Sequence, residues 1–305
     1  CGSTALTLAA HISLGTHPIY AWGGEDLKAR YVGSSMGFFW SVIFPIVNLF
    51  VFMFVFRLVL KMRWGDTVGE KEVALFMLIG ILVWAAFAET VSRATNSLIE
   101  NANLIQKVVF PSEILPVYLV TSSIVNMLIG IPIVLVGVIF FTDQMPGLAL
   151  LWVPILCLLQ FLFTVGLTYF LATLNLFLRD TYHLVGVGVQ VWMFVTPIFY
   201  PVEMVREAKL MLPHWLSFLS NAPPGFLKDG TPVVIGPDEG GWFTLDWMLE
   251  VNPMHWLIDA WREVVLYNSM PDMALLVRFT VVALLVFVLG AVFFRSQQAK
   301  FPDLL

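Results

Sequence analysis

Charged residues are scarce in this sequence, and cysteines are scarcer still. Only 12% of the 305 residues are charged, whereas soluble domains carry about a quarter, so a soluble domain is excluded. The two cysteines, Cys1 and Cys157, provide neither a disulfide framework nor the spacing of a metal site. The net charge of −5 also excludes nucleic acid as a partner, because binding to phosphates requires a dense patch of Lys and Arg.

Sequence motifs for catalysis are absent as well. No Gly-x-x-x-x-Gly-Lys-Ser/Thr pattern occurs, so the chain has no phosphate-binding loop and any ATP-driven motor must be another subunit. His255 and Asp259 share one helix face and could act as a base and its orienting partner. Because no Ser, Cys or second carboxylate cluster accompanies them, we expect interfacial polar residues, no enzyme, no metal site and no cofactor on this chain.

Long apolar runs make up most of the chain. Hydrophobic residues account for 59% of it, and the mean hydropathy is +0.86. A helix of about 20 apolar residues crosses the hydrocarbon core of a bilayer, so the sequence predicts an all-α membrane protein with six transmembrane helices. The predicted spans lie at about 38–60, 73–92, 114–141, 148–178, 184–200 and 278–294.

The distribution of Lys and Arg predicts the orientation in the membrane. Six spans place both termini on one side, whose short loops and tails hold seven basic residues against three on the other. By the positive-inside rule the termini are cytoplasmic. The chain then divides into a cytoplasmic segment (1–35), a six-span domain (36–295) and a cytoplasmic tail (296–305). We expect the initial Cys1 to reflect trimming rather than a processed lipoprotein.

Two polar stretches interrupt the apolar pattern. Residues 18–35 alternate aromatic and charged residues at helical spacing, which predicts an amphipathic interface helix with Lys28 and Arg30 facing lipid phosphates and Tyr31 at headgroup depth. The other stretch runs from Arg93 to Glu113 between two apolar runs. It cannot lie in hydrocarbon and predicts a short helix at the membrane surface, where either a partner docks or two spans are simply joined.

The predicted spans contain amides rather than charges, which weakens the hypothesis of an ion-coupled carrier. Their aromatic residues could stack on sugar rings in a pore, although a role in the core or toward lipid is the alternative. These aromatic residues are Phe39, Trp40, Phe44, Trp192, Phe199 and Tyr200. Gly186 and Gly188 in the fifth span permit close helix approach.

The region 201–276 is the only long part outside the predicted spans. It begins with an amphipathic segment, 202–219, that is compatible with a re-entrant pair, and continues with a Pro-, Gly- and Asp-rich loop. Helical periodicity returns at 245–267. We therefore expect outer gate helices and a loop here.

Four stretches in order carry a family resemblance. They are Asp-Leu-Lys-Ala-Arg-Tyr-Val-Gly-Ser-Ser-Met-Gly-Phe-Phe-Trp-Ser-Val-Ile-Phe-Pro (26–45), Asn-Leu-Ile-Gln-Lys-Val-Val-Phe-Pro-Ser-Glu-Ile-Leu-Pro (103–116), Phe-Leu-Arg-Asp-Thr-Tyr-His (177–183) with Thr-Pro-Ile-Phe-Tyr-Pro (196–201), and Val-Asn-Pro-Met-His-Trp-Leu-Ile-Asp-Ala-Trp-Arg (251–262). Together they resemble the permease subunits of polysaccharide-exporting ABC transporters of the O-antigen and teichoic-acid export type. The segment Asn221 to Trp247 departs from that pattern as an insertion.

The resemblance implies a homodimer that binds two copies of a separate ABC ATPase subunit, which holds ATP and Mg. Such a complex would move a lipid-linked polysaccharide across the bacterial cytoplasmic (inner) membrane. The polar stretch would contain the coupling helix, at 96–110, and the first and fifth spans would line the channel. The residues expected to face the ATPase are Glu100, Asn101, Asn103, Leu104, Ile105 and Lys107.

Further roles follow from the same resemblance. Lys28, Arg30 and Tyr31 would meet the lipid headgroup at the entrance, and Pro197 and Pro201 would belong to the outer gate. Two other functions stay open: a related permease for a drug or small lipid, and a membrane-embedded transferase that uses His255 and Asp259.

Overall fold

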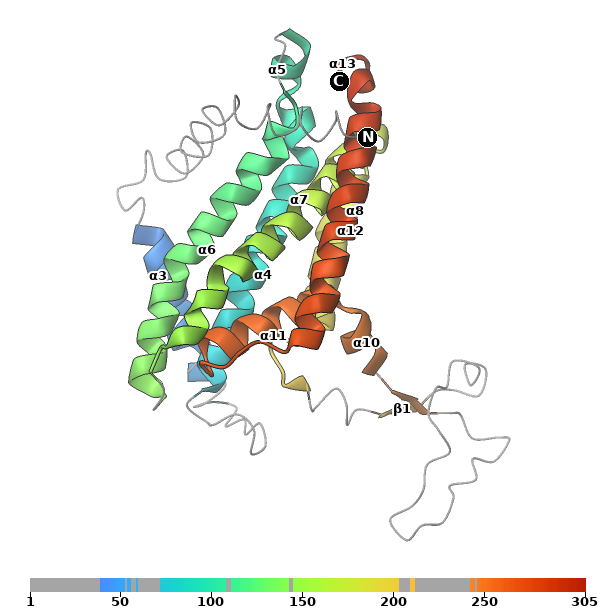
Figure 1. The fold of residues 1–305 in the computed structure, drawn as a ribbon. Coiled ribbons are helices and arrows are strands. Elements are labelled where there is room, and N and C mark those ends of the chain that lie inside the picture. The colour runs from blue at the N-terminus through green and yellow to red at the C-terminus, as the bar shows by residue number, and fades with distance from the viewer. Residues whose placement is uncertain are drawn as a thin grey trace, which may run out of the picture.

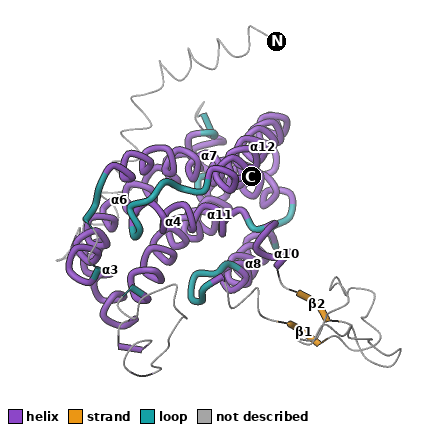
Figure 2. The backbone as a smooth tube through the Cα atoms, turned by 60° about the horizontal axis from the view of Figure 1, so that its bottom comes forward, coloured by secondary structure: helices purple, strands orange, loops and turns teal. Residues whose placement is uncertain are grey.

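A computed structural model describes residues 39–52, 54–55, 59, 72–107, 111–142, 145–202, 209–211, 242–244 and 246–305. In these parts the chain is a bundle of helices, accompanied by one small antiparallel sheet (Figure 1). The sheet pairs β1 (Lys209–Met211) with β2 (Trp242–Thr244), and it lies away from the bundle (Figure 2). The predicted all-helical class is therefore confirmed for the bundle.

Four helices in the described part of the chain are long and apolar enough to cross a membrane. They are α4 (Val73–Glu100), α6 (Ile114–Phe141), α7 (Val153–Phe177, preceded by the 3-10 turn η2, Leu148–Trp152) and α12 (Met273–Gln297). The apolar helices α3 (Phe39–Phe52) and α8 (Thr181–Val195) are shorter. The six-span count thus stays a prediction for the first and fifth spans.

Helix α8 ends where the sequence requires it to end. Its last residue is Val195, and Thr196 has extended backbone angles before Pro197. Proline disfavours the helical conformation in the residue that precedes it. The observed helix has 15 residues. Compared with the predicted fifth span, 184–200, it begins three residues earlier and ends five residues earlier.

Helix α4 lies at the centre of the bundle and contacts α6, α7, α8 and α11. In its most apolar window 72% of the residues are buried inside the chain, against 22% for α12. The remaining apolar surface of α12 faces outward, where only lipid or another chain can cover it. A hydrogen bond from Gln160 Nε2 on α7 to the Val83 carbonyl on α4 (3.2 Å) joins the two central helices.

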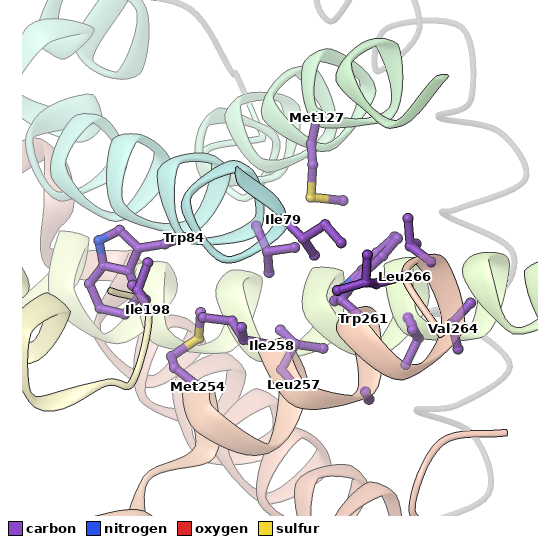
Figure 3. Packing of buried hydrophobic residues seen from close by; sticks show 14 of the residues in the cluster. Ile79, Trp84, Met127, Ile198, Met254, Leu257, Ile258, Trp261, Val264 and Leu266 are labelled. Carbon is purple, nitrogen blue, oxygen red and sulfur yellow. The ribbon is translucent and has the colours of Figure 1, made fainter. Parts of the chain in front are cut away.

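Helix α11 (Pro253–Val265) lies across one end of the bundle, preceded by the short α10 (Asp246–Val251) (Figures 1 and 2). The periodic stretch predicted at 245–267 is thus two helices, because Asn252 ends one and caps the next. Its apolar side chains point into the bundle toward α4 and α6 (Figure 3). They include Met254, Leu257, Ile258, Trp261 and Val264, which belong to the same buried cluster as Ile79, Trp84 and Met127.

The opposite end carries α5 (Ala102–Lys107), the turn η4 (Gln298–Lys300) and α13 (Phe301–Leu304) (Figure 1). A second buried cluster lies beneath them, and Phe301 and Phe294 pack there with ring centroids 5.1 Å apart. The polar stretch and the C-terminal tail of the chain are therefore neighbours at one end. This arrangement defines two ends of the bundle: the α5 end and the α11 end.

Candidate functional site

The polar stretch forms the end of one long helix and a separate short one. Helix α4 continues through the predicted span boundary to Glu100 and ends at Asn101, whose backbone angles (φ −105°, ψ 23°) are no longer helical and whose Nδ2 donates to the Ser97 carbonyl (2.8 Å). The coupling helix expected at 96–110 is described as far as residue 107, in two pieces. Residues 96–100 are the last turn of α4, and the free-standing part is α5.

The residues expected to face an ATPase are distributed around this break. Glu100 and Asn103 are exposed, while Asn101, Leu104 and Ile105 are half-buried. Lys107 ends α5, and its side chain, like residues 108–110, lies outside the described part. Around the break, the Glu100 carboxylate and the Asn103 amide are therefore exposed to solvent, next to the half-buried apolar side chains of Leu104 and Ile105.

Helix α7 and the following turn hold the end of α4 in place through a buried amide. Asn175 Nδ2 donates to Asn96 Oδ1 (3.4 Å), and Asn175 Oδ1 accepts the backbone N–H of Tyr182 at the start of α8 (3.2 Å). Asn96 in turn donates to Glu100 Oε1 (2.9 Å). One chain of hydrogen bonds therefore connects the exposed carboxylate to the first turn of α8.

The C-terminal residues brace α5 from the other side. Phe301 is buried in the second cluster, and Ile105, Leu304 and Leu305 pack against the same cluster. Gln298 Nε2 also donates to Ser112 Oγ, just before α6 (3.3 Å). The position of α5 therefore depends on a segment almost two hundred residues away in the chain.

At the α11 end, Asn252 connects α8 to α11. Its Oδ1 accepts the backbone N–H of Met254 (3.1 Å), which caps α11 ahead of Pro253. The same oxygen accepts the indole N–H of Trp192 (2.9 Å), and its Nδ2 donates to Thr196 Oγ1 (2.9 Å). All three contacts are made by a buried side chain, so the end of α8 and the start of α11 are held as one unit.

Arg262 holds the other end of α11. Its side chain is 1% exposed, Nε donates to the Phe76 carbonyl of α4 (3.3 Å), and Nη2 donates to the Ile198 carbonyl (3.2 Å). Its guanidinium also lies 3.4 Å above the ring of Phe76. Burial lowers the pKa of Arg262 to about 10, which still leaves the side chain charged near neutral pH.

The aromatic residues expected to line a channel occupy different surroundings. Trp192 packs edge-on against Trp84 and Phe87, with centroids 6.0 and 5.4 Å away. Phe199 is half-buried, and the Tyr200 hydroxyl donates to the Phe194 carbonyl (2.6 Å). The structure thus packs the half-buried Trp192 against the edge of the core, while Phe199 and Tyr200 lie beyond the end of α8.

Other predicted site residues are placed less completely. Pro197 and Pro201 are buried on either side of this turn. Phe39, Trp40 and Phe44 belong to α3, but their side chains lie outside the described part. Lys28, Arg30, Tyr31 and the predicted interface helix at 18–35 lie outside the described residues entirely, as do most of the predicted re-entrant segment and the inserted segment.

Sequence reasoning missed the roles of Asn252 and Arg262. A signal for the first existed, because Asn followed by Pro is the pattern of a helix N-cap and first helical position. No local signal marked Arg262, whose partners Phe76 and Ile198 are far away in the chain.

Comparison with known proteins identifies the family. A profile described as ABC-2 type transporter matches residues 23–227, more than half of the chain. This chain belongs to the ABC-2 type transporter family. Members of this family are transport permeases that lie in a membrane and pair with an ATPase subunit.

Curated relatives of this ABC-2 permease include proteins named O-antigen export system permease protein RfbA. One from Klebsiella pneumoniae is 26% identical over 282 residues, and one from Myxococcus xanthus is 25% identical over 280 residues. Each alignment covers 92% of both chains. The resemblance inferred from four ordered stretches is therefore confirmed over nearly the whole length.

Proposed function

We propose that this ABC-2 permease is the membrane-spanning subunit of an exporter that moves a lipid-linked polysaccharide, O-antigen-like or teichoic-acid-like, across the bacterial inner membrane. The observation that carries the proposal is the similarity, along 92% of both chains, to O-antigen export permeases. ATP and Mg would be held by two copies of a separate ATPase subunit. Both termini would be cytoplasmic, which assigns the α5 end to the cytoplasm.

The α5 end is the proposed point where ATPase movement reaches the permease. Glu100, Asn101, Asn103, Leu104, Ile105 and Lys107 would form the contact surface. A displacement of this surface would act directly on α4, because only Asn101 separates the two helices. Through Asn96 and Asn175 it would also reach α8.

Helix α8 supports the proposal of a homodimer. Leu184, Val187, Val191 and Phe194 expose large apolar side chains on this helix. Nothing in the described chain lies within 4 Å of a Cβ placed at Gly186 or Gly188, so these glycines do not serve helix packing within one described subunit. A second copy would cover this face, and the first and fifth spans of both copies would enclose the channel.

The remaining assignments concern the route of the glycan. Lys28, Arg30 and Tyr31 would receive the lipid headgroup at the entrance. Phe39, Trp40, Phe44, Trp192, Phe199 and Tyr200 would supply aromatic surface along the channel, and Pro197 and Pro201 would belong to the outer gate. For Trp192 this role requires the ring to leave its contacts with Trp84 and Phe87.

Reconstitution of the permease with its ATPase in proteoliposomes tests the function. We expect lipid-linked polysaccharide to raise ATP hydrolysis and to be transferred across the bilayer. Stimulation by drugs or small lipids alone would instead indicate the related permease function. If His255→Ala abolished a glycan product while leaving stimulated ATP hydrolysis intact, a transferase would replace the transport proposal.

Charge reversal at the α5 end tests the docking surface. We expect Glu100→Lys combined with Lys107→Glu to reduce co-purification of the ATPase at least fivefold, because a desolvated charge pair at a protein interface is worth about 1 kcal/mol or more. The control is Glu250→Lys, an exposed carboxylate on α10 at the other end. Equal recovery of the ATPase with both variants would contradict docking at α5.

A side-chain truncation at Phe301 tests whether the C-terminal segment positions α5. Phe301→Ala removes a fully buried ring, a change that typically costs about 3–5 kcal/mol of local packing. We expect substrate-stimulated ATP hydrolysis to fall to the basal rate while the membrane bundle still folds. Phe177→Ala, at an exposed position near the same end, is expected to retain stimulation, and loss in both variants would argue against a specific brace.

A further inference from the structure

Helix α8 is held at each end by an asparagine that lies outside it. Of its 15 residues, all of which the structure describes, Thr181 in the first turn is the only buried one. Asn252 holds the α11 end of α8 through two side-chain hydrogen bonds. At the α5 end, the backbone N–H of Tyr182 donates to Asn175 Oδ1 on α7 (3.2 Å). The positions of both ends of α8 therefore depend on side chains from other segments.

The N-terminus of α8 receives no cap from the residue that precedes it. Asp180 occupies the N-cap position, but its backbone is helical (φ −69°, ψ −15°) and its side chain makes no capping hydrogen bond. The first N–H groups of a helix have no partner inside the helix, and an N-cap side chain normally accepts one of them at the second or third position. Tyr182 is at the second position of α8. Asn175, which belongs to α7, thus supplies the cap that Asp180 does not.

The hydrogen bonds that lead from this cap to α4 have a fixed direction. Because the Tyr182 N–H can only donate, Asn175 presents Oδ1 to it and Nδ2 to Asn96. Asn96 then presents Oδ1 to Asn175 and Nδ2 to the Glu100 carboxylate, which can only accept (2.9 Å). A flipped amide at either asparagine would bring two donors or two acceptors face to face. The groups at both ends of the chain therefore determine how each amide is oriented.

Burial makes the bonds of Asn175 costly to break. Its side chain is 1% exposed, so water does not readily replace a lost partner, and a buried polar group without a partner is strongly unfavourable. The bond between Asn175 and Asn96 (3.4 Å) is the longest of the three and therefore the weakest. When the last turn of α4 moves, either the first turn of α8 follows it or this bond breaks.

We propose that Asn175 is a positioning residue through which the last turn of α4 sets the position of the first turn of α8. The inference rests on the proposed function, in which an ATPase acts at the α5 end, and it deepens that function by naming the residue that passes the movement on. Helix α8, the fifth predicted span, then responds to ATP at its cytoplasmic end, while Asn252 keeps its other end attached to α11.

Hydrogen exchange in the full permease–ATPase complex in lipid nanodiscs tests this role. Mass spectrometry of peptides that contain residues 181–184 compares two states, one without nucleotide and one with ATP trapped by vanadate. We expect exchange in the first turn of α8 to differ about threefold or more between the two states, because the opening of a helix end depends on the bonds that hold it. The measurement requires no glycan.

Three variants separate the cap from the link to α4. Asn96→Leu removes the link but leaves the cap on Tyr182, so exchange without nucleotide should be normal and the nucleotide-dependent difference should disappear. Asn96→Asp keeps an oxygen that accepts from Asn175 Nδ2, and it should retain the difference. Asn175→Leu removes both bonds, and the first turn of α8 should exchange about fivefold faster even without nucleotide.

The matched control is Ser92→Leu. Ser92 is half-buried one turn before Asn96 on α4, and it should retain the nucleotide-dependent difference after the same substitution. Both leucine variants should keep the Tm and co-purify with the ATPase, but only Asn96→Leu should reduce glycan-stimulated ATP hydrolysis to the basal rate. If the Tm of Asn96→Leu falls, Asn96→Ala repeats the test with a smaller change.

Four results reject the role of Asn175. They are no nucleotide-dependent difference in the unaltered complex, a retained difference in Asn96→Leu, equal loss in Asn96→Asp or in Ser92→Leu, and normal exchange in Asn175→Leu. Glycan transport by the unaltered complex, measured separately in proteoliposomes, tests the exporter itself. Transport without the difference rejects the role of Asn175 alone, whereas the difference without transport rejects the exporter and leaves the coupling between α4 and α8.

Discussion

Gly290→Ala is expected to prevent α12 from packing against α7 and to lower the stability of the whole bundle. A Cβ at Gly290 would overlap the carbonyl oxygen of Gly166, and a Cβ at Gly166 would overlap the backbone of Phe287. Both obstacles are backbone atoms, which cannot rotate away as a side chain can. We expect a loss of about 3 kcal/mol or more, seen as a lower Tm and a lower yield of monodisperse protein in detergent.

The chain offers a matched control for this substitution. Gly188 lies in the apolar helix α8, and a Cβ there meets nothing within 4 Å in the described chain. Gly188→Ala is therefore expected to leave the Tm of the single subunit unchanged or slightly higher, since alanine favours a helix over glycine by about 1 kcal/mol. Equal destabilisation by both substitutions would show that the close α7–α12 contact does not determine stability.

Arg262→Met is expected to detach α11 from the bundle. Methionine fills similar space but leaves the carbonyls of Phe76 and Ile198 without their buried donors. The Phe76 carbonyl keeps its intrahelical bond within α4, whereas the Ile198 carbonyl loses a buried donor, at a cost of about 1–3 kcal/mol. The cation–π contact with Phe76 is lost as well, so we expect a loss of roughly 3 kcal/mol in total. Thermal unfolding monitored by circular dichroism measures the loss, and limited proteolysis should show earlier cleavage around α11.

Two further variants distinguish a buried clamp from a simple loss of charge. Arg278→Met removes the same charge at the same end from an exposed position, and it should change the Tm little. Arg262→Lys keeps the charge but not the planar guanidinium that reaches two carbonyls at once, so it should recover only part of the stability. If Arg262→Lys matched the unaltered protein, charge alone would account for the effect of Arg262.

The hydrogen bonds of Asn252 and Arg262 restrict how α11 can move in the proposed gate. Asn252 fastens the start of α11 to the end of α8, and Arg262 fastens its other end to α4 and to the turn after α8. Any outward movement of α11 relative to α4 must break the Arg262 contacts, whereas a joint movement of α8 and α11 keeps those of Asn252. A joint movement of α8 and α11 therefore breaks fewer hydrogen bonds than a movement of α11 alone.

The sequence alone determined the class of this protein and its family. Long apolar runs with few charges leave only helices as a way to satisfy the backbone in lipid, and four ordered stretches were specific enough to indicate an ABC permease. It also indicated that the polar stretch after the second span belongs at a surface. Helix ends next to proline or asparagine, as at Thr196 and Asn252, follow from local chemistry and were partly readable.

Only the tertiary structure decided which residues hold the two ends of the bundle. The contacts of Arg262 with Phe76 and Ile198, of Phe301 with Phe294 and Ile105, and of Gly290 with Gly166 join segments that no periodicity relates. The exact break at Asn101 was not predicted either, because the stretch carries asparagine at 96, 101 and 103 and the sequence does not single one of them out. Hydrophobic patterning specifies that a face is buried, but the partner of that face depends on how the helices pack in three dimensions.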